Sequence, residues 1–174
     1  TDDPVYGEFL QTRAVQGLRA EGQVNVAFQT RVSRLPDGTE VVLHEPQYET
    51  YNLQYGVLSH QLSARVAPSL RGLGLLEQIP EYYLESLADP DDDNADGISG
   101  RISKVRQPGS DALVTGRFGW KAETASLEVQ IARAFRLDMG LGTALFPSAF
   151  GDCTAGQPVC LQQASGNSPE ASDP

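Results

Sequence analysis

Oxygen-bearing side chains crowd into one short stretch of the chain, residues 89–100. A run of carboxylates is the chemistry that a hard cation, calcium above all, prefers in proteins. An EF-hand-type loop places side-chain oxygens at its first, third and fifth positions, a glycine at the sixth and a backbone carbonyl at the seventh. Counted from the third aspartate of the stretch, these positions fall on Asp92, Asn94, Asp96, Gly97 and Ile98. We therefore predict a calcium site in which Ile98 gives its carbonyl and turns its side chain into the core.

The predicted calcium loop is incomplete as an EF-hand, because its twelfth position is Ser103 rather than a bidentate glutamate. We expect Asp89, Asp91 or water to complete the ligand set. A second register through Asp89, Asp91 and Asp93 lacks the glycine and ranks lower. The alternative is an acidic, solvated loop without an ion, but packing so many carboxylates together without a cation costs repulsion.

Three further side chains could take part in redox or proton-transfer chemistry. Trp120 is the only tryptophan, and it lies between the basic residues Arg117 and Lys121. A lone tryptophan is most often a core anchor, which is the alternative interpretation here. Gln130 and Asp138 lie roughly 80° apart around a helix, so both can face one site. Spacing alone does not make them a catalytic pair.

The two cysteines, Cys153 and Cys160, predict a small disulfide loop in an oxidising compartment. Their separation does not match a Cys-x-x-Cys metal or redox motif, and the chain has no Cys-x-x-Cys-His for covalent haem attachment. Two free thiols are the alternative. The disulfide favours a periplasmic or extracellular location.

The secondary structure that must position these residues is also predicted by the sequence, and it amounts to a loop-rich α+β fold. Alternating apolar and polar residues around the turn Leu35-Pro36-Asp37-Gly38 predict a β-hairpin over about residues 22–52. A helix is predicted over about 80–88, opened by a proline and a glutamate. A second helix is predicted over about 125–138, capped by Thr124 or Ser126 and ended by Gly140. Residues 1–150 are expected to form a single calcium-binding domain, followed by a loop and linker over 151–174.

The composition of the chain limits the classes of partner that we expect it to bind. The chain has 174 residues, a formal net charge of −10 and a pI near 4.5. A negative field repels phosphate backbones, so we expect no nucleic acid partner. No apolar run approaches the length of a membrane span, so none is expected. His44, His60 and Met139 are interpreted as structural residues rather than haem ligands.

Four blocks of the sequence form a further pattern: residues 65–68 with 72–77, residues 96–101, residues 116–122 and residues 126–140. In their order and spacing these blocks resemble the bacterial di-haem oxidoreductase family, whose members are also described as thiol oxidoreductases. In that family this stretch lies between two c-type cytochrome modules, each with its own Cys-x-x-Cys-His. The resemblance therefore implies a middle segment, whose haems and flanking cytochrome c partners come from sequence outside this chain.

Trp120 with Ala122, then Leu127-Glu128-Val129-Gln130, then Asp138-Met139 make up another pattern. In this pattern the chain is more distantly similar to bacterial di-haem cytochrome c peroxidases and to the related maturation enzymes for tryptophan-derived cofactors, which carry a Trp followed by Ala, then Leu-Glu-x-Gln, then an acid and Met. The resemblance implies that Trp120 relays electrons between haems near a calcium ion, Gln130 positions a peroxide by hydrogen bonding, and Asp138 donates or accepts a proton. Here the acid is Asp rather than the usual Glu and comes slightly earlier in the sequence.

Two hypotheses follow from these residues. The first is the calcium-binding central segment of a periplasmic di-haem, peroxidase-like oxidoreductase, inactive when isolated from its haems. The alternative is a stand-alone, calcium-stabilised structural or assembly module without catalytic activity. Flanking Cys-x-x-Cys-His motifs in the same reading frame would favour the first hypothesis.

Overall fold

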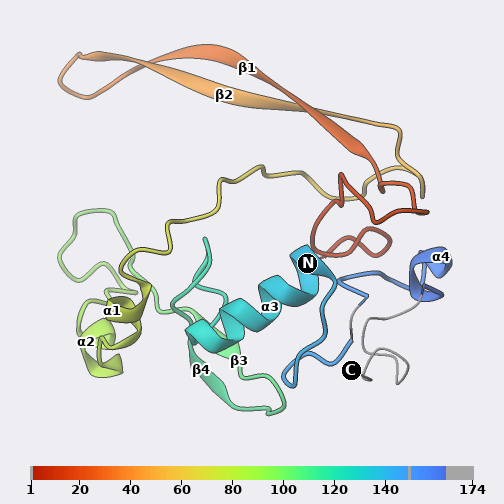
Figure 1. The fold of residues 1–174 in the computed structure, drawn as a ribbon. Coiled ribbons are helices and arrows are strands. Elements are labelled where there is room, and N and C mark those ends of the chain that lie inside the picture. The colour runs from red at the N-terminus through yellow and green to blue at the C-terminus, as the bar shows by residue number, and fades with distance from the viewer. Residues whose placement is uncertain (1, 149, 164–174) are drawn as a thin grey trace. The chain divides into compact units, whose positions relative to one another are not determined.

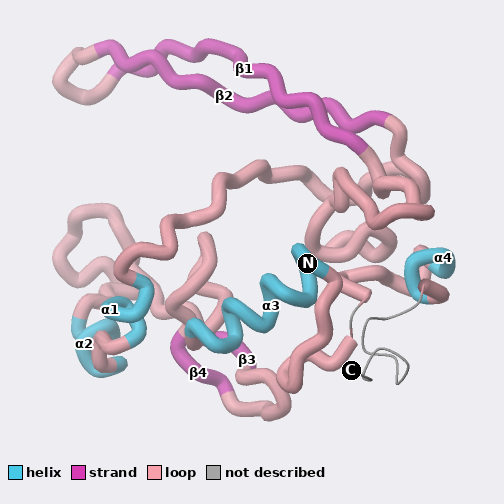
Figure 2. Tube along the Cα trace, in the orientation of Figure 1, coloured by secondary structure: helices cyan, strands magenta, loops and turns pink. Residues whose placement is uncertain are grey.

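The computed structural model describes residues 2–148 and 150–163, which fold as a loop-rich α+β arrangement with two small antiparallel sheets and short helices (Figure 1). This confirms the predicted fold class. Loops connect all the elements and make up much of the described chain (Figure 2). In chain order the elements are β1 (Gln23–Arg34), β2 (Glu40–Tyr51), α1 (Leu73–Glu77), α2 (Glu81–Ser86), β3 (Lys104–Arg106), β4 (Leu113–Thr115), α3 (Leu127–Met139) and α4 (Pro158–Leu161).

The predicted hairpin is confirmed as β1 and β2, which pair along their whole length from Gln23 opposite Tyr51 to Arg34 opposite Glu40. Its turn closes with a hydrogen bond from the Leu35 N–H to the carbonyl of Thr39 at 2.8 Å. Gly38 takes a positive φ of 87°, which suits glycine. The turn is therefore built by local residue chemistry.

The chain divides into two compact units. The first comprises residues 1–64 and 152–163, and the second comprises residues 65–151. The first unit packs around Tyr6, which is 1% exposed. The Tyr6 hydroxyl donates to the carbonyl of Gly56 at 2.7 Å and accepts from the N–H of Tyr55 at 3.0 Å. The predicted division into a domain over 1–150 and a linker over 151–174 stays a prediction, and the linker beyond residue 163 lies outside the described residues.

The disulfide prediction is confirmed, because Cys153 and Cys160 are bonded with a Cα–Cα distance of 6.3 Å. The segment around it holds the N-terminal residues of the first unit. The carboxylate of Asp152 accepts from the N–H groups of Glu8 at 2.9 Å and Phe9 at 2.8 Å. Carboxylate acceptors for backbone N–H groups replace the regular strand pairing that this part of the unit lacks.

A buried polar pair, Gln157 and Glu21, connects the same segment to the rest of the first unit. Gln157, which is fully buried, donates from Nε2 to Glu21 Oε1, and Glu21 Oε2 accepts from the N–H of Gln11 at 2.8 Å. Burial raises the pKa of Glu21, because desolvation penalises the carboxylate more than these donors favour it. The Gln157 amide therefore satisfies a group that would otherwise be costly to bury.

The helices of the second unit follow their local signals. The Ser126 hydroxyl accepts from the N–H of Val129 at 3.2 Å, and Gly140 ends α3 with a left-handed φ of 65°. The predicted helix over 125–138 is thus confirmed as α3, with Ser126 as its cap. The predicted helix over 80–88 is confirmed as the shorter α2. Phe118, 3% exposed, is the most buried apolar residue described in this unit.

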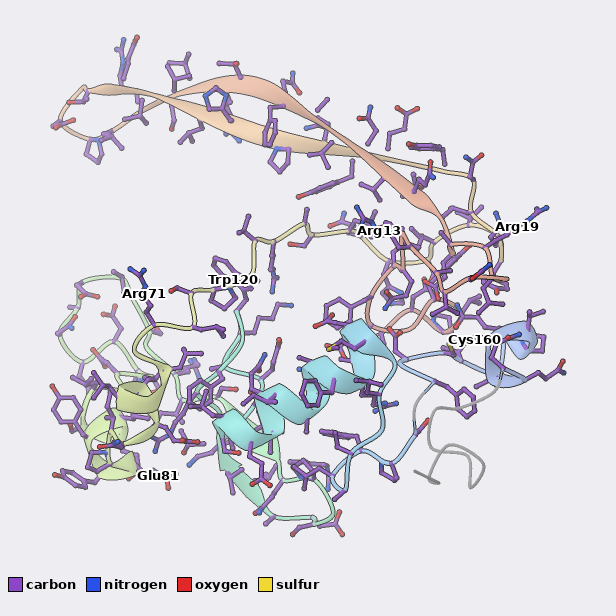
Figure 3. The ribbon with its side chains drawn as sticks, in the orientation of Figure 1. Arg13, Arg19, Arg71, Glu81, Trp120 and Cys160 are labelled. Atoms are coloured by element: carbon purple, nitrogen blue, oxygen red, sulfur yellow. A yellow bond between two sulfur atoms is a disulfide. The ribbon has the colours of Figure 1, made fainter. Side chains whose placement is uncertain are left out.

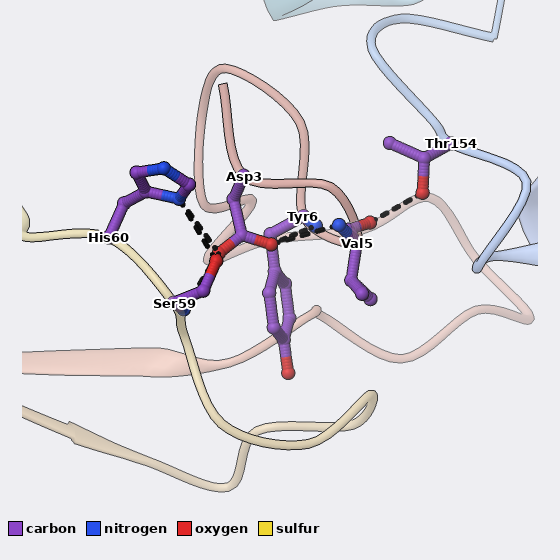
Figure 4. Close-up of polar contacts among 6 residues, drawn as sticks. All are labelled: Asp3, Val5, Tyr6, Ser59, His60 and Thr154. Atoms are coloured by element: carbon purple, nitrogen blue, oxygen red, sulfur yellow. Dashed lines mark hydrogen bonds and ion pairs between the residues drawn. The ribbon is translucent and has the colours of Figure 1, made fainter. Parts of the chain in front are cut away.

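The side-chain carboxylate of Asp3, near the N-terminus of the chain, accepts four hydrogen bonds in the first unit (Figure 4). Its Oδ1 accepts from the N–H groups of Tyr6 at 3.0 Å and Val5 at 2.9 Å. Its Oδ2 accepts from the N–H of Ser59 at 2.8 Å and from the Ser59 hydroxyl at 2.7 Å, with His60 Nδ1 at 3.6 Å. The N–H of Tyr6, followed by the Ser59 hydroxyl, holds the pKa of Asp3 well below its usual range.

The substitution Asp3→Asn should lower the free energy of unfolding by about 2 kcal/mol at neutral pH, because a charged acceptor of four hydrogen bonds is lost. A depressed pKa contributes stability above the ordinary aspartate pKa of about 3.9, and this is lost as the pH falls through the folded-state pKa. The difference between the two proteins should therefore shrink as the pH falls below about 4. Urea unfolding across this pH range measures it, with Asp2→Asn as the exposed control; equal losses from both substitutions would contradict the assignment.

Candidate functional site

Trp120 lies near the tip of a tight turn, residues 116–124, which closes on its own backbone. The N–H groups of Arg117 and Phe118 both donate to the carbonyl of Thr124, at 2.7 and 3.0 Å. The N–H of Glu123 returns a bond to the carbonyl of Phe118 at 2.9 Å. We call this segment the Trp120 turn. Its backbone bonds at both ends leave little freedom at the tip.

Glycine at the base of the Trp120 turn is required by a close backbone approach. A Cβ atom on Gly116 would lie 1.9 Å from the carbonyl oxygen of Ala122, far inside van der Waals contact. Ala122 itself takes a positive φ of 48°, and Gly119 takes one of 82°. These residues fold the turn so tightly that one side of the base admits only a hydrogen atom.

Arg117 fastens the Trp120 turn to α1. Its Nη1 donates to the carbonyls of Glu77 at 3.0 Å and Leu76 at 3.2 Å, and also to the carbonyl of Ile79. Leu76 and Glu77 are the last two residues of α1 and Ile79 lies just beyond it, where a helix end leaves carbonyl groups without regular intrahelical partners. The guanidinium thus donates hydrogen bonds at the C-terminus of α1, and its positive charge interacts favourably with the negative end of the helix dipole.

Glu77 connects the end of α1 to the start of α3. Its Oε1 accepts from the N–H of Leu127 at 2.8 Å, one of the first amides of α3 that lack an intrahelical partner. Together with Arg117, this contact ties α1, the Trp120 turn and α3 into one assembly within the second unit. The side chains on the turn and on the start of α3 are therefore positioned relative to each other.

Trp120 is 58% exposed, so its interpretation as a core anchor is wrong. Its Nε1–H donates to the carbonyl of Val66 at 2.7 Å, which fixes the ring against the segment that precedes α1 (Figure 3). A large aromatic surface that stays in solvent forgoes the stabilisation that burial would give. The indole is therefore held in place but not buried.

Gln130 and Asp138 lie on the same helix without approaching each other. Gln130 is partly buried at the end of the first turn of α3, where its Oε1 accepts from the Thr124 hydroxyl at 2.7 Å. Asp138 is exposed in the last turn, about 12 Å further along the helix axis. The structure places Gln130 beside the Trp120 turn through Thr124, and it does not bring Asp138 to the same point.

The acidic loop closes on its own backbone amides. Asp92 accepts from the N–H of Gly97 with both carboxylate oxygens, at 3.2 and 3.1 Å, and from the N–H of Asp96 at 3.0 Å. Asp96 accepts from the N–H of Ile98 at 2.8 Å, and Asn94 from the N–H of Asp96 at 2.9 Å. The glycine bend is as predicted, because Gly97 takes a positive φ of 84°.

One feature of the acidic loop differs from the prediction, and the calcium site itself stays a prediction. The Ile98 side chain is 70% exposed, so the expectation that it enters the core is wrong. The bond from its N–H to Asp96 turns the backbone there, and the side chain is left outside. Within residues 2–148 and 150–163, no three His, Cys, Asp or Glu side chains converge on a common metal position. The donors are the hard oxygens that calcium prefers, but they are arranged here around amides.

A family model described as "Di-haem oxidoreductase, putative peroxidase" matches residues 6–164 of the chain. This chain belongs to that family. The match includes the acidic loop, the Trp120 turn and the whole of α3. No curated protein and no solved structure matches the chain.

The residues of this chain can be compared with what a di-haem enzyme needs. Its two cysteines form the disulfide, and the sequence has no Cys-x-x-Cys-His motif. In the described portion, no helix has the length and apolarity to cross a membrane. What the chain offers is a positioned surface made by the Trp120 turn and α3.

Sequence reasoning missed the residues that build this surface. In the sequence, Arg117 stands out as a neighbour of Trp120 and as part of a family block, and Glu77 only as part of a family block. Thr124 was considered as a helix cap rather than as a partner of Gln130. Their partners lie in other elements, so sequence spacing gives no signal of these contacts beyond the family blocks that contain Glu77 and Arg117.

Gly116→Ala should destabilise the chain by about 3 kcal/mol or more, because its methyl group would displace the Ala122 carbonyl. Gly74→Ala is the matched control, since its Cβ meets no atom within 4 Å. That substitution should stabilise the chain by about 0.5–1 kcal/mol through helix propensity. Chemical unfolding of both variants measures the difference. A tolerated alanine at position 116 would show that the turn is less tight than described.

Proposed function

We propose that this chain is the central segment of a periplasmic, peroxidase-like di-haem enzyme, in which flanking cytochrome c modules carry both haems. Family membership supports a reaction that uses two haems, and the chain lacks the residues to attach either one. The disulfide between Cys153 and Cys160 suits an oxidising compartment. The haems supply the redox chemistry when bound, and the protein orients the reacting groups.

The exposed and fixed indole of Trp120 is the observation that carries this proposal. An aromatic ring that served only stability would be buried, where its large apolar area contributes most. Here a glycine-dependent turn, a guanidinium anchor and an indole hydrogen bond all hold the ring outside the core. We infer that the ring meets a flanking module and relays electrons between the two haems.

Gln130 and Asp138 have separate tasks in this proposal. Gln130 hydrogen-bonds the peroxide, and Asp138 exchanges a proton with it or with a connected water. A positioned carboxyl can deliver the proton that a leaving oxygen needs. Because the two side chains lie far apart along α3, each must act at a different point of the site.

We further propose that the acidic loop binds calcium through Asp92, Asn94, Asp96 and the carbonyl of Ile98, with Asp89 or Asp91 completing the set. The support is chemical: five aspartates and an asparagine lie within eight consecutive residues. Each carboxylate oxygen has two lone pairs, so one that accepts an N–H can still ligate a cation. A cation would also relieve the repulsion between these carboxylates.

In the full-length enzyme, Asp138→Asn should lower the rate of peroxide reduction by about a hundredfold, a typical contribution of a positioned proton donor. Stability should not change, because the side chain is exposed. Glu128→Gln is the matched control, since Glu128 is an exposed acid on the same helix. Steady-state rates with hydrogen peroxide and the haem absorption of each purified protein measure the effect. A native protein without a haem band would instead favour the stand-alone structural module.

Removing calcium with EDTA should lower the melting temperature of the chain. An ion at one hundred times its Kd stabilises the folded state by about 2.7 kcal/mol, which corresponds to roughly 5–10 °C for a chain of this size. The variant Asp96→Asn should lose most of this response, whereas Asp111→Asn, an exposed acid outside the loop, should keep it. A melting temperature that stays constant across a calcium titration would contradict the proposed calcium site.

A further inference from the structure

Thr124 is 2% exposed, and its backbone is fixed in the Trp120 turn by three hydrogen bonds. Its carbonyl accepts from Arg117 and Phe118, and its N–H donates to the carbonyl of Phe118 at 3.2 Å. A β-branched side chain has few rotamers available, so a fixed backbone also fixes the hydroxyl. The hydroxyl therefore has a defined position relative to α3.

The buried Thr124 hydroxyl decides which way the Gln130 amide faces. A buried O–H must find an acceptor, because an unsatisfied donor in such a place is costly. The acceptor is Gln130 Oε1 at 2.7 Å, and the Thr124 hydroxyl has no other partner among the described residues. If the amide were reversed, its Nε2 would face the hydroxyl, and the hydroxyl hydrogen would lose its acceptor.

With Oε1 engaged, Gln130 presents the two N–H bonds of Nε2 away from Thr124. No side chain or backbone group in the described part of the chain accepts from this nitrogen. Gln130 is only partly buried, so Nε2 remains able to meet a ligand. The side chain is thus a donor whose direction is set in advance.

We propose that Thr124 is a positioning residue that orients the Gln130 amide as a hydrogen-bond donor, and that the ligand it meets offers an acceptor oxygen, as a peroxide does. This inference rests on the proposed function for its substrate class. The orientation of the amide rests only on contacts within the chain. Preorganising a donor in this way avoids rotating the amide when the ligand arrives.

The orientation can be tested first on the 174-residue chain, without any haem. The side-chain amide of Gln130 gives two proton signals in a nitrogen-15 correlated NMR spectrum. In Thr124→Val, which removes the hydroxyl and keeps the shape, these signals should shift and report faster side-chain motion. Thr124→Ser, which keeps the hydroxyl, should restore them. If Thr124→Val leaves the signals unchanged, or if Thr124→Ser behaves like Thr124→Val in a folded protein, the inference is overturned.

The consequence for reactivity is tested on the full-length haem-bearing enzyme with hydrogen peroxide. Thr124→Val and Gln130→Leu should each raise KM for peroxide, with a smaller change in kcat, and the double variant should be little worse than Gln130→Leu alone. If Gln130→Leu impairs the reaction and Thr124→Val does not, the positioning role is overturned. If Gln130→Leu has no effect, the proposed function of Gln130 fails, and the NMR result still decides the orientation.

Discussion

The contact on which the second unit depends is the one between Arg117 and the end of α1. A single guanidinium nitrogen donates to the carbonyls of Leu76 and Glu77, the last two residues of the five-residue α1, and to that of Ile79 just beyond it. A helix this short is not stable by propensity, because too few hydrogen bonds repay its nucleation. The guanidinium therefore lets α1 end at a defined place, and Glu77 at that end reaches the first amide of α3. Together with the Glu77–Leu127 and Thr124–Gln130 bonds, this contact gives the Trp120 turn, α1 and α3 a common frame.

The same contact explains how a large aromatic ring can be both exposed and ordered. An exposed tryptophan on a free loop would sample many orientations, since no packing restricts its two side-chain torsions. Here the loop is closed at its base by Gly116 and Thr124 and fastened by Arg117, while the indole N–H is held by the Val66 carbonyl. Order comes from hydrogen bonds and a close backbone approach instead of burial. This separates the position of the ring from its contribution to stability.

Much of the fold could be predicted because its signals are local. The β1–β2 hairpin is specified by alternation and a turn containing Gly38, and α3 by the Ser126 cap and the Gly140 stop. The three-residue strands β3 and β4 and the five-residue α1 were not predicted, because so few residues show no period. The exposure of Trp120 and of Ile98 was also beyond reach. Burial depends on what the rest of the chain brings to a side chain, and neither composition nor spacing contains that information.

The acidic loop and the Thr124–Gln130 pair show two ways in which a protein can prepare a polar site. In the loop, the carboxylates accept their own backbone amides, so a cation would find oxygens that are already ordered but must share their lone pairs. At Gln130, one end of an amide is used by a buried hydroxyl, so the other end is fixed as a donor. The first arrangement tolerates the absence of a ligand, because the amides already hold the loop. The second leaves Nε2 without an acceptor among residues 2–148 and 150–163, and that asymmetry makes Gln130 the sharper basis for the proposed contact with a substrate oxygen.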